Sequence, residues 1–314
     1  MKKEEILRES IDIIQKAGFY LASIREHSGA SFDLIARRDS LLILVRVTVN
    51  IDSITKDVCD ELKLLAKYLD AAVFIVGVKS TGYRLEPGVV YTRYGIPIIN
   101  PETLEDLFIH GVEPFSHSAH GGFYVTIDRK KLKKLRFERQ ISLSVLAEKA
   151  GVSKRAIQMY EEGMDVSIDT ALKLEEFLGV PLITSTDIFT LGSKFQSEDV
   201  PLRKMNLHPF EREVMRALER LGTHVIPIFR CPFNALTTDR KSVIITGIAR
   251  AQNNIERKIE LLSLISRISE KHTIYVVDRV KGKRNIKGVP IVDKRVLIRL
   301  QGTDDFERLM KENP

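Results

Sequence analysis

The first hundred residues alternate between hydrophobic positions at helical spacing and short, nearly continuous apolar runs. Apolar residues at positions 6, 11, 13 and 14 predict a helix from Lys2 to about Lys16. Strands are predicted at residues 19–24, 32–36, 41–49 and 72–78, a second helix from Asp52 or Ser53 to Leu69, and a closing helix at 101–110. The pattern predicts an α/β domain that begins with antiparallel hairpins.

The same order of elements recurs near the C-terminus. In the first part, a predicted helix ending at Gly18 is followed by SFDLIARRDSLLILVRV and later by AAVFIVGV. In the second part, a predicted helix ending at Gly222 is followed by PFNALTTDRKSVIITGI and later by HTIYVVDRV. Asp33 corresponds to Asn234, and the spacing between matched positions agrees to within a residue. The sequence therefore predicts an internal duplication.

Between the two copies, the polar segments 111–122 and 192–209 are expected to be linkers, and the part they enclose has helical spacing throughout. Asp128 is a candidate N-cap for a helix over residues 129–140, which holds seven basic residues and one acidic residue. Ser142, Ser153 and Ser167 are candidate N-caps of three further helices. Gly151 lies where a tight turn between two helices needs a positive φ.

A helix-turn-helix requires two helices joined by a segment such as Ala-x-x-Ala-Gly-Val-Ser, because small residues let the helices cross closely and Gly permits a sharp turn. The second helix of such a motif enters the major groove of DNA. Candidates for base contacts are Lys154, Arg155, Gln158 and Met159. Candidates for phosphate contacts are Ser142, Ser144, Ser153, Lys133 and Arg136.

Composition is that of an ordinary globular protein. The 314 residues are 44% hydrophobic and 29% charged, and 49 Lys and Arg against 42 Asp and Glu give a net charge of +7, which suits a polyanionic partner. Two cysteines provide no disulfide framework, the longest apolar run is far too short for a membrane span, and no signal peptide is apparent. We expect a cytoplasmic protein without a membrane contact.

The segment from LKKLRFERQISLSVLAEKAGVSKRAIQMYEEG to SIDTALKLEEFLGVPL resembles the phage-repressor-like (Xre/Cro) helix-turn-helix family. The resemblance implies a five-helix domain that binds double-stranded DNA as a dimer. Two positions depart from the family pattern. Leu143 replaces a Gln that bonds a phosphate, and Gln140 replaces the Gly that ends the first helix.

The flanking α/β units resemble the restriction-endonuclease-like core of Holliday-junction resolvases. In active members an Asp and a later Glu-x-Lys hold Mg²⁺. Asp33 occupies the first position, but the Glu-x-Lys position falls on Val45-Arg46-Val47, and in the second copy the positions are Asn234 and Thr246-Gly247-Ile248. Valine cannot bind a hard cation, so both sites are expected to be empty and Asp33 to be a structural hydrogen-bond acceptor.

Over its whole length the chain resembles an archaeal family of HTH-type transcriptional regulators, notably in FDLIARR, GGFYVTID and LKLEEFLG. We therefore expect a multidomain protein in which two similar degenerate nuclease-like α/β domains flank an all-α helix-turn-helix domain. The expected boundaries are 1–112 for the first α/β domain, 113–127 for a linker with a short strand, 128–187 for the helix-turn-helix domain with its motif at about 143–162, 188–209 for a second linker, and 210–314 for the second α/β domain.

The sequence thus favours a regulator that binds specific double-stranded DNA, acts as a homodimer, and has no catalytic residues, bound metal or cofactor. An unidentified effector or the transcription machinery are further possible partners. The alternatives are a nuclease targeted by the helix-turn-helix and an adaptor that bridges transcription proteins. A metal site at His110, His117 and His120 has little support, Cys59 and Cys231 are expected to be buried apolar residues, and the basic segment 279–288 is either a solvated loop or a second contact to the DNA backbone.

Overall fold

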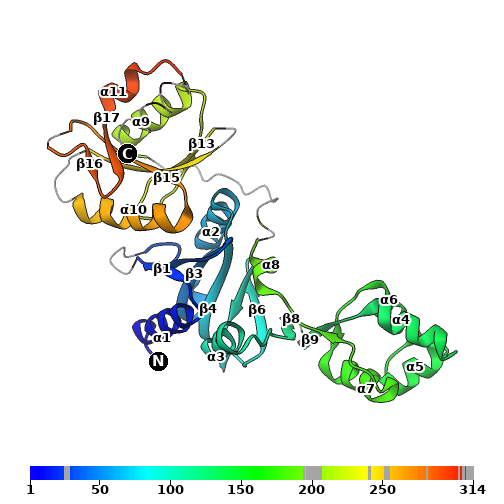
Figure 1. The fold of residues 1–314 in the computed structure, drawn as a ribbon. Helices are drawn as coiled ribbons and strands as arrows, with labels where there is room; N and C mark the ends of the chain where they lie inside the picture. Colours follow the sequence, from blue (N-terminus) through cyan, green and yellow to red (C-terminus); the bar gives the residue numbers. More distant parts are fainter. Residues whose placement is uncertain are drawn as a thin grey trace. The chain divides into compact units, whose positions relative to one another are not determined.

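The computed structural model describes residues 1–24, 29–119, 121–193, 195, 207–239, 242–250, 255–280, 282–302, 305 and 308 (Figure 1). The chain forms two compact units. One contains Met1–Ile13, Thr48–Ser53 and Phe74–Leu191, and the other contains Ile14–Val47, Ile54–Val73 and Gly192–Pro314. The N-terminal α/β segment contributes to both units.

The N-terminal segment contains the predicted helices and strands together with three strands that the sequence did not indicate. Its elements are α1 (Lys3–Lys16), β1 (Tyr20–Ser23), β2 (Leu34–Arg38), β3 (Leu41–Asn50), η1 (Ile51–Ser53), α2 (Lys56–Leu69), β4 (Ala72–Ser80), β5 (Tyr83–Arg84), β6 (Val89–Arg93), β7 (Ile96–Ile99), α3 (Pro101–Glu105) and the π-helix η2 (Asp106–His110). The N-cap of α2 is Thr55, so the expectation of Asp52 or Ser53 was wrong. Those two residues form a 3₁₀ turn, in which the Asp52 carboxylate accepts hydrogen bonds from Ser80 Oγ and the Thr81 amide.

The first sheet continues beyond the N-terminal segment, in the order β1-β2-β3-β4-β7-β6-β8-β9-β10. Strands β1, β2 and β3 are antiparallel neighbours, and β7 is parallel to β4 and antiparallel to β6. Segment 113–127, expected to be a linker with one short strand, contains two strands, β8 (Ser116–Ala119) and β9 (Gly122–Ile127). Strand β8 was not expected, because its polar Ser-His-Ser sequence shows no strand pattern. Its backbone groups are satisfied by parallel pairing with β6.

The middle of the chain folds into the predicted helices, α4 (Arg129–Glu138), α5 (Leu143–Ala150), α6 (Lys154–Glu162) and α7 (Ile168–Leu178), followed by α8 (Ile188–Ser193). Two short strands, β10 (Val166–Ser167) and β11 (Ile183–Thr184), both pair with β9. The expectation of an all-α domain was therefore wrong. Its core is formed by apolar residues of the helices together with Val125 and Val166 of the strands.

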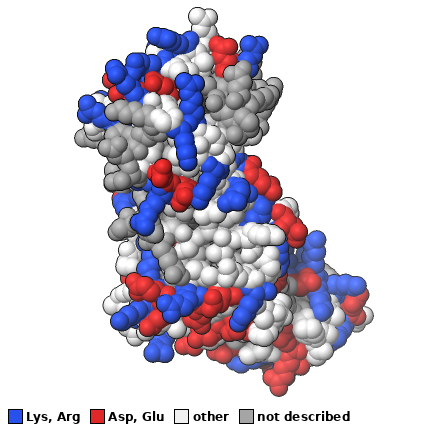
Figure 2. Space-filling model, turned by 60° about the vertical axis from the view of Figure 1, so that its left-hand side comes forward, with Lys and Arg blue, Asp and Glu red and all other residues white. Residues whose placement is uncertain are grey.

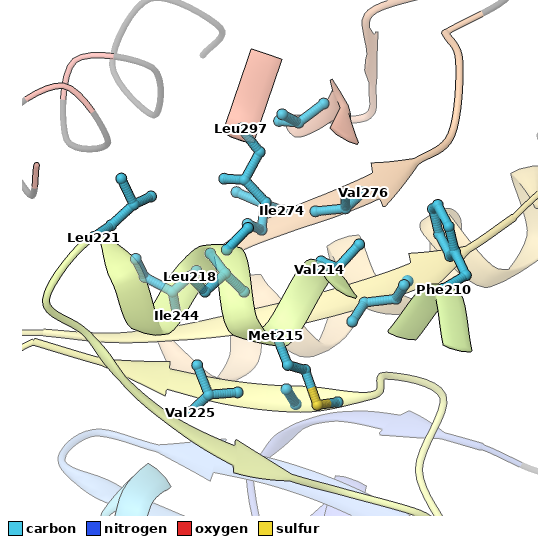
Figure 3. Packing of buried hydrophobic residues seen from close by; sticks show 14 residues of the cluster. Phe210, Val214, Met215, Leu218, Leu221, Val225, Ile244, Ile274, Val276 and Leu297 are labelled. Carbon is cyan, nitrogen blue, oxygen red and sulfur yellow. The ribbon is translucent and has the colours of Figure 1, made fainter. Parts of the chain in front are cut away.

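The C-terminal segment is a second α/β unit. It contains α9 (Pro209–Arg220), β12 (His224–Pro227), β13 (Ala235–Thr238), β14 (Val243–Ala249), α10 (Glu256–Ser269), β15 (His272–Val277), β16 (Asn285–Ile286), β17 (Val289–Asp293) and α11 (Lys294–Arg299). One face of α9 packs on the sheet through Phe210, Val214 and Leu218, which meet Ile274 and Val276 (Figure 3).

The order of the second sheet, β12-β13-β14-β15-β17-β16, repeats that of β1-β2-β3-β4-β7-β6 in the first. In the second sheet β12, β13 and β14 are antiparallel neighbours, β15 is parallel to β14 and to β17, and β16 is antiparallel to β17. In the first sheet β7 is likewise parallel to β4 and antiparallel to β6. The helices also correspond, with α9 in the place of α1, α10 in that of α2 and α11 in that of α3. No helix in the described ranges is long and apolar enough to cross a membrane.

Candidate nucleic-acid interface

Helices α5 and α6 are joined by a tight turn, and each of them begins with a capping serine. Ser142 Oγ accepts a hydrogen bond from the Val145 amide at 3.2 Å, and Ser153 Oγ accepts one from the Ala156 amide at 3.1 Å. Gly151 has a φ of +71°, as the tight turn requires. The N-caps predicted from the sequence at Asp128, Ser142, Ser153 and Ser167 are all confirmed.

Helix α6 presents one face to the helical core and the opposite face to solvent. Ile157 and Tyr160 are buried, which fixes the rotation of the helix. Lys154, Arg155, Gln158 and Met159 are all exposed and share the other face. The side chains of Lys154, Arg155 and Gln158 form no hydrogen bond or ion pair with other described residues. This face therefore has long donor and acceptor side chains available for an external partner.

Four of the five residues predicted to contact phosphates are also accessible. Ser142, Ser144 and Ser153 are exposed at the N-termini of α5 and α6, where backbone amides and the helix dipole favour an anion. Lys133 is exposed on α4 and has no ion pair among the described residues.

Arg136, the fifth residue predicted to contact phosphates, forms an ion pair within the domain. Its guanidinium donates two hydrogen bonds to Glu161 on α6, with Nε–Oε1 at 2.6 Å and Nη2–Oε2 at 2.9 Å. The two side chains are only 13% and 8% exposed. Hydrogen bonding to Glu161 raises the pKa of the guanidinium above its usual value. Arg136 therefore fastens α6 to α4, and its guanidinium is engaged by Glu161 rather than directed to solvent.

Most other basic residues of α4 are also used within the domain. Arg129 donates to the carbonyl of Glu162 and Arg139 to that of Leu178, at the C-termini of α6 and α7, where cations are favoured. Lys131 donates to the carbonyl of Pro181, and Lys134 pairs with Glu138. Most basic side chains of this helix thus bond to groups within the domain rather than remaining free for an external anion. The sequence alone did not reveal these bonds.

The two departures from the helix-turn-helix pattern have clear structural counterparts. Gln140 adopts a φ of +52°, in the left-handed region where glycine is favoured. Leu143 is half-buried against the helical core, so it packs rather than contacting a phosphate.

The position corresponding to a nuclease site is occupied by structural interactions. Asp33 Oδ2 accepts a hydrogen bond from the Val47 amide at 2.7 Å and lies 3.5 Å from Arg46 Nη1. In the second unit Asn234 Oδ1 accepts the equivalent bond from the Ile248 amide at 2.7 Å. The prediction that Asp33 is a hydrogen-bond acceptor is confirmed.

Two of the remaining candidate residues, His117 and Cys231, have structural partners. No group of three or more His, Cys, Asp or Glu in the described ranges could hold a metal ion. His117 pairs with Asp165 at 3.2 Å, and His120 lies outside the described residues. Cys59 and Cys231 are buried thiols, as predicted, and burial together with the nearby Glu61 carboxylate raises the pKa of Cys231.

Comparison with known proteins gives the class of the protein. Residues 132–184 match the family model described as helix-turn-helix, and residues 3–114 match that of the PD-(D/E)XK superfamily domain. The fold and the exposed face of α6 thus define a helix-turn-helix protein that also contains a nuclease-superfamily domain.

Full-length relatives give the family. A protein of Methanosarcina acetivorans is 34% identical over 99% of this chain and 98% of its own length, and one of Pyrococcus furiosus is 36% identical with the same coverage. One of Archaeoglobus fulgidus is 33% identical over 98% of this chain and 97% of its own length. All three bear the name "putative HTH-type transcriptional regulatory protein". The chain belongs to this archaeal family of HTH-type transcriptional regulatory proteins. No solved structure matches it.

Proposed function

We propose that this protein is a transcriptional regulator that binds specific double-stranded DNA and contacts the major groove with residues 153–162. The observation that carries the proposal is the exposed face of α6, whose rotation is fixed by two buried residues and by the Arg136–Glu161 pair. Lys154 and Arg155 donate to guanine, Gln158 bonds adenine, and Met159 contacts a thymine methyl group. Ser142, Ser144, Ser153 and Lys133 contact phosphates.

The test is selection of bound sequences from a random duplex library, followed by binding measurements on the selected duplex. Arg155→Ala is expected to relax the sequence preference and to weaken binding by about 1–3 kcal/mol on the selected duplex. Lys133→Ala is the control because it should weaken all sequences alike and lower the salt dependence. An Arg155 variant that selects the same motif with the same affinity would contradict the assignment.

The protein acts as a homodimer in this proposal, since one such helix covers only a half-site. The selected sequence should then contain two half-sites whose centres are about 34–36 Å apart. Sedimentation of the full chain with the selected duplex should give two chains per duplex. A single unrepeated motif bound by one chain would exclude the dimer.

The two α/β units are degenerate nuclease-like domains in this proposal, and the domain boundaries stay at 1–112, 128–187 and 210–314, with β8 and β9 between the first two. The shared strand order and the equivalent bonds of Asp33 and Asn234 support a duplication. The relatives' names describe regulators, whereas the superfamily of the first domain includes nucleases.

The protein does not cleave DNA in this proposal. Asp33 is held by a backbone amide and Arg46, and Val45 and Val47, which replace the Glu and Lys of an active site, are fully buried apolar residues. Incubation with duplex and branched DNA in the presence of Mg²⁺ should leave both intact. Cleavage that Asp33→Ala abolishes would establish a nuclease instead.

A further inference from the structure

The basic surplus of the chain does not lie in the helix-turn-helix domain. Residues 128–187 contain eleven Lys and Arg against ten Asp and Glu, and residues 1–112 contain fourteen against sixteen. Residues 210–314 contain twenty-one Lys and Arg against thirteen Asp and Glu. Their net charge of +8 is larger than the +7 of the whole chain. In the view of Figure 2 basic and acidic side chains are both spread over the surface.

Within the C-terminal unit the surplus is concentrated after α10. Residues 271–302 contain nine basic residues and two acidic ones. The corresponding part of the N-terminal unit, residues 71–110, has the same order of strands but three basic and four acidic residues. Because the two segments share a strand order and differ by eight charges, folding does not require the positive charge. The charge therefore points to a function that one copy has and the other lacks.

The two acidic residues of this segment are already paired. Asp278 lies 3.7 Å from Lys294, and Asp293 lies 3.7 Å from Arg295 and also caps α11. Four cations are left exposed without a hydrogen bond or ion pair among the described residues. These are Arg279, Lys283 and Arg284 of the loop after β15 and Arg299 of α11.

The loop is held in place by its own hydrogen bonds. The carbonyl of Arg284 accepts from the Ile291 amide at 2.7 Å, and Asn285 Oδ1 accepts from the Gly288 amide at 2.9 Å. Gly282 and Arg284 of the loop line a cavity of about 300 Å³ with Asp293 and Val296 at the start of α11. The loop thus lies against the start of α11, and its exposed cations Arg279, Lys283 and Arg284 are named here the basic loop surface.

We infer that the basic loop surface binds the phosphate backbone of duplex DNA and supplies affinity that does not depend on sequence. The inference rests on the proposed function, because the DNA bound by α6 is the polyanion that this protein would meet. Guanidinium and ammonium groups that are free of internal partners neutralise phosphates and release counterions, which makes binding strongly dependent on salt. The reading helix then provides specificity with little net charge in its own domain.

The test compares two double variants of the full chain by their binding to a random duplex and to the selected duplex over a range of salt concentrations. Lys283→Gln with Arg284→Gln removes two cations of the basic loop surface. Lys79→Gln with Arg84→Gln removes two exposed cations from the paired ends of β4 and β5, at the corresponding position of the N-terminal unit. The slope of log K against log salt should fall by about 1.8 in the first variant, which is about 60-fold in affinity between 1 M and 0.1 M salt, and should not change in the second.

The outcomes separate this inference from the proposed function. An unchanged slope in the first variant, with sequence selection intact, overturns the inference alone. A lowered slope in a protein that selects no sequence motif overturns the proposed function and leaves the inference standing. Equal losses in both variants overturn the inference, as does an effect limited to single-stranded RNA or to phosphatidylserine vesicles.

Discussion

Removal of Glu161 tests whether the Arg136–Glu161 pair fastens the reading helix. Glu161→Ala would leave the Arg136 guanidinium largely buried without its carboxylate. Exposed ion pairs contribute about 0.2–1 kcal/mol, whereas loss of one partner of a buried pair costs about 3–5 kcal/mol. Because these side chains are 8–13% exposed and make two short bonds, we expect a cost near the lower end of the buried range, about 3 kcal/mol.

Amide hydrogen exchange in the full chain measures this cost locally. A loss of about 3 kcal/mol should accelerate exchange in α4 and α6 by about 100-fold. The matched control is Lys134→Ala, which breaks the exposed Lys134–Glu138 pair on the same helix and should cost about 0.5 kcal/mol or less. Replacement of both partners, Arg136→Met with Glu161→Leu, should recover most of the loss because no buried charge remains.

The same pair has a second, independent consequence for DNA binding. Arg136→Ala should weaken binding through the misplaced helix while the salt dependence stays as in the unmodified protein. A fall of about 0.9 in the salt slope would show that Arg136 contacts a phosphate after all. If amide hydrogens of α4 and α6 exchange no faster in Glu161→Ala than in Lys134→Ala, the structural role of the Arg136–Glu161 pair is refuted.

Three further changes test other parts of the structure. Gln140→Gly removes a left-handed non-glycine residue and should stabilise the domain by about 0.5 kcal/mol, the strain relief being partly offset by greater freedom of the unfolded chain; a lower melting temperature would contradict this. Hydrogen bonds from Ser80 and Thr81 lower the pKa of Asp52 from 3.8 to about 2, so its stabilising contribution is complete above about pH 5 and is lost as the pH falls towards 2. Asp52→Asn should abolish that part of the acid dependence, about 1 kcal/mol after solvent screening, in denaturation curves recorded between pH 2 and 5. Glu61→Ala removes the acceptor of hydrogen bonds from the Ser31 hydroxyl and from the amides of Phe229 and Arg230. It should lower the free energy of unfolding by about 3 kcal/mol in urea denaturation, whereas Glu61→Gln should lower it clearly less.

Local sequence rules were sufficient for the helix-turn-helix. Each of its helices begins at a Ser or Asp whose side chain accepts a hydrogen bond from an amide three residues on, so the signal lies entirely within one turn. The strands β2, β3 and β4 were also predictable, because long apolar runs between turn residues have few alternatives.

What the sequence did not reveal depends on partners far away in the chain. Strand β8 has no apolar alternation, and it forms because Val89 and Val90 offer a free strand edge. Arg136 and Glu161 are 25 residues apart, and nothing in the basic composition of α4 distinguishes an arginine held by a carboxylate from one free in solvent. A helical wheel would have placed Glu161 beside the buried Ile157 and Tyr160, which is the one clue that was available.

Strand β9 receives both ends of the helix-turn-helix domain. The chain passes from β9 into α4, and β11 returns alongside β9 after α7, with the Asp128 amide bonded to the Leu182 carbonyl at 2.8 Å. Since the two junctions are adjacent, the helical domain is attached like an insert at a single point, and its removal would leave only a short gap to close. The residues between β9 and β11 should therefore be replaceable as a unit. A helix-turn-helix of different specificity grafted there should make the protein bind a different DNA sequence.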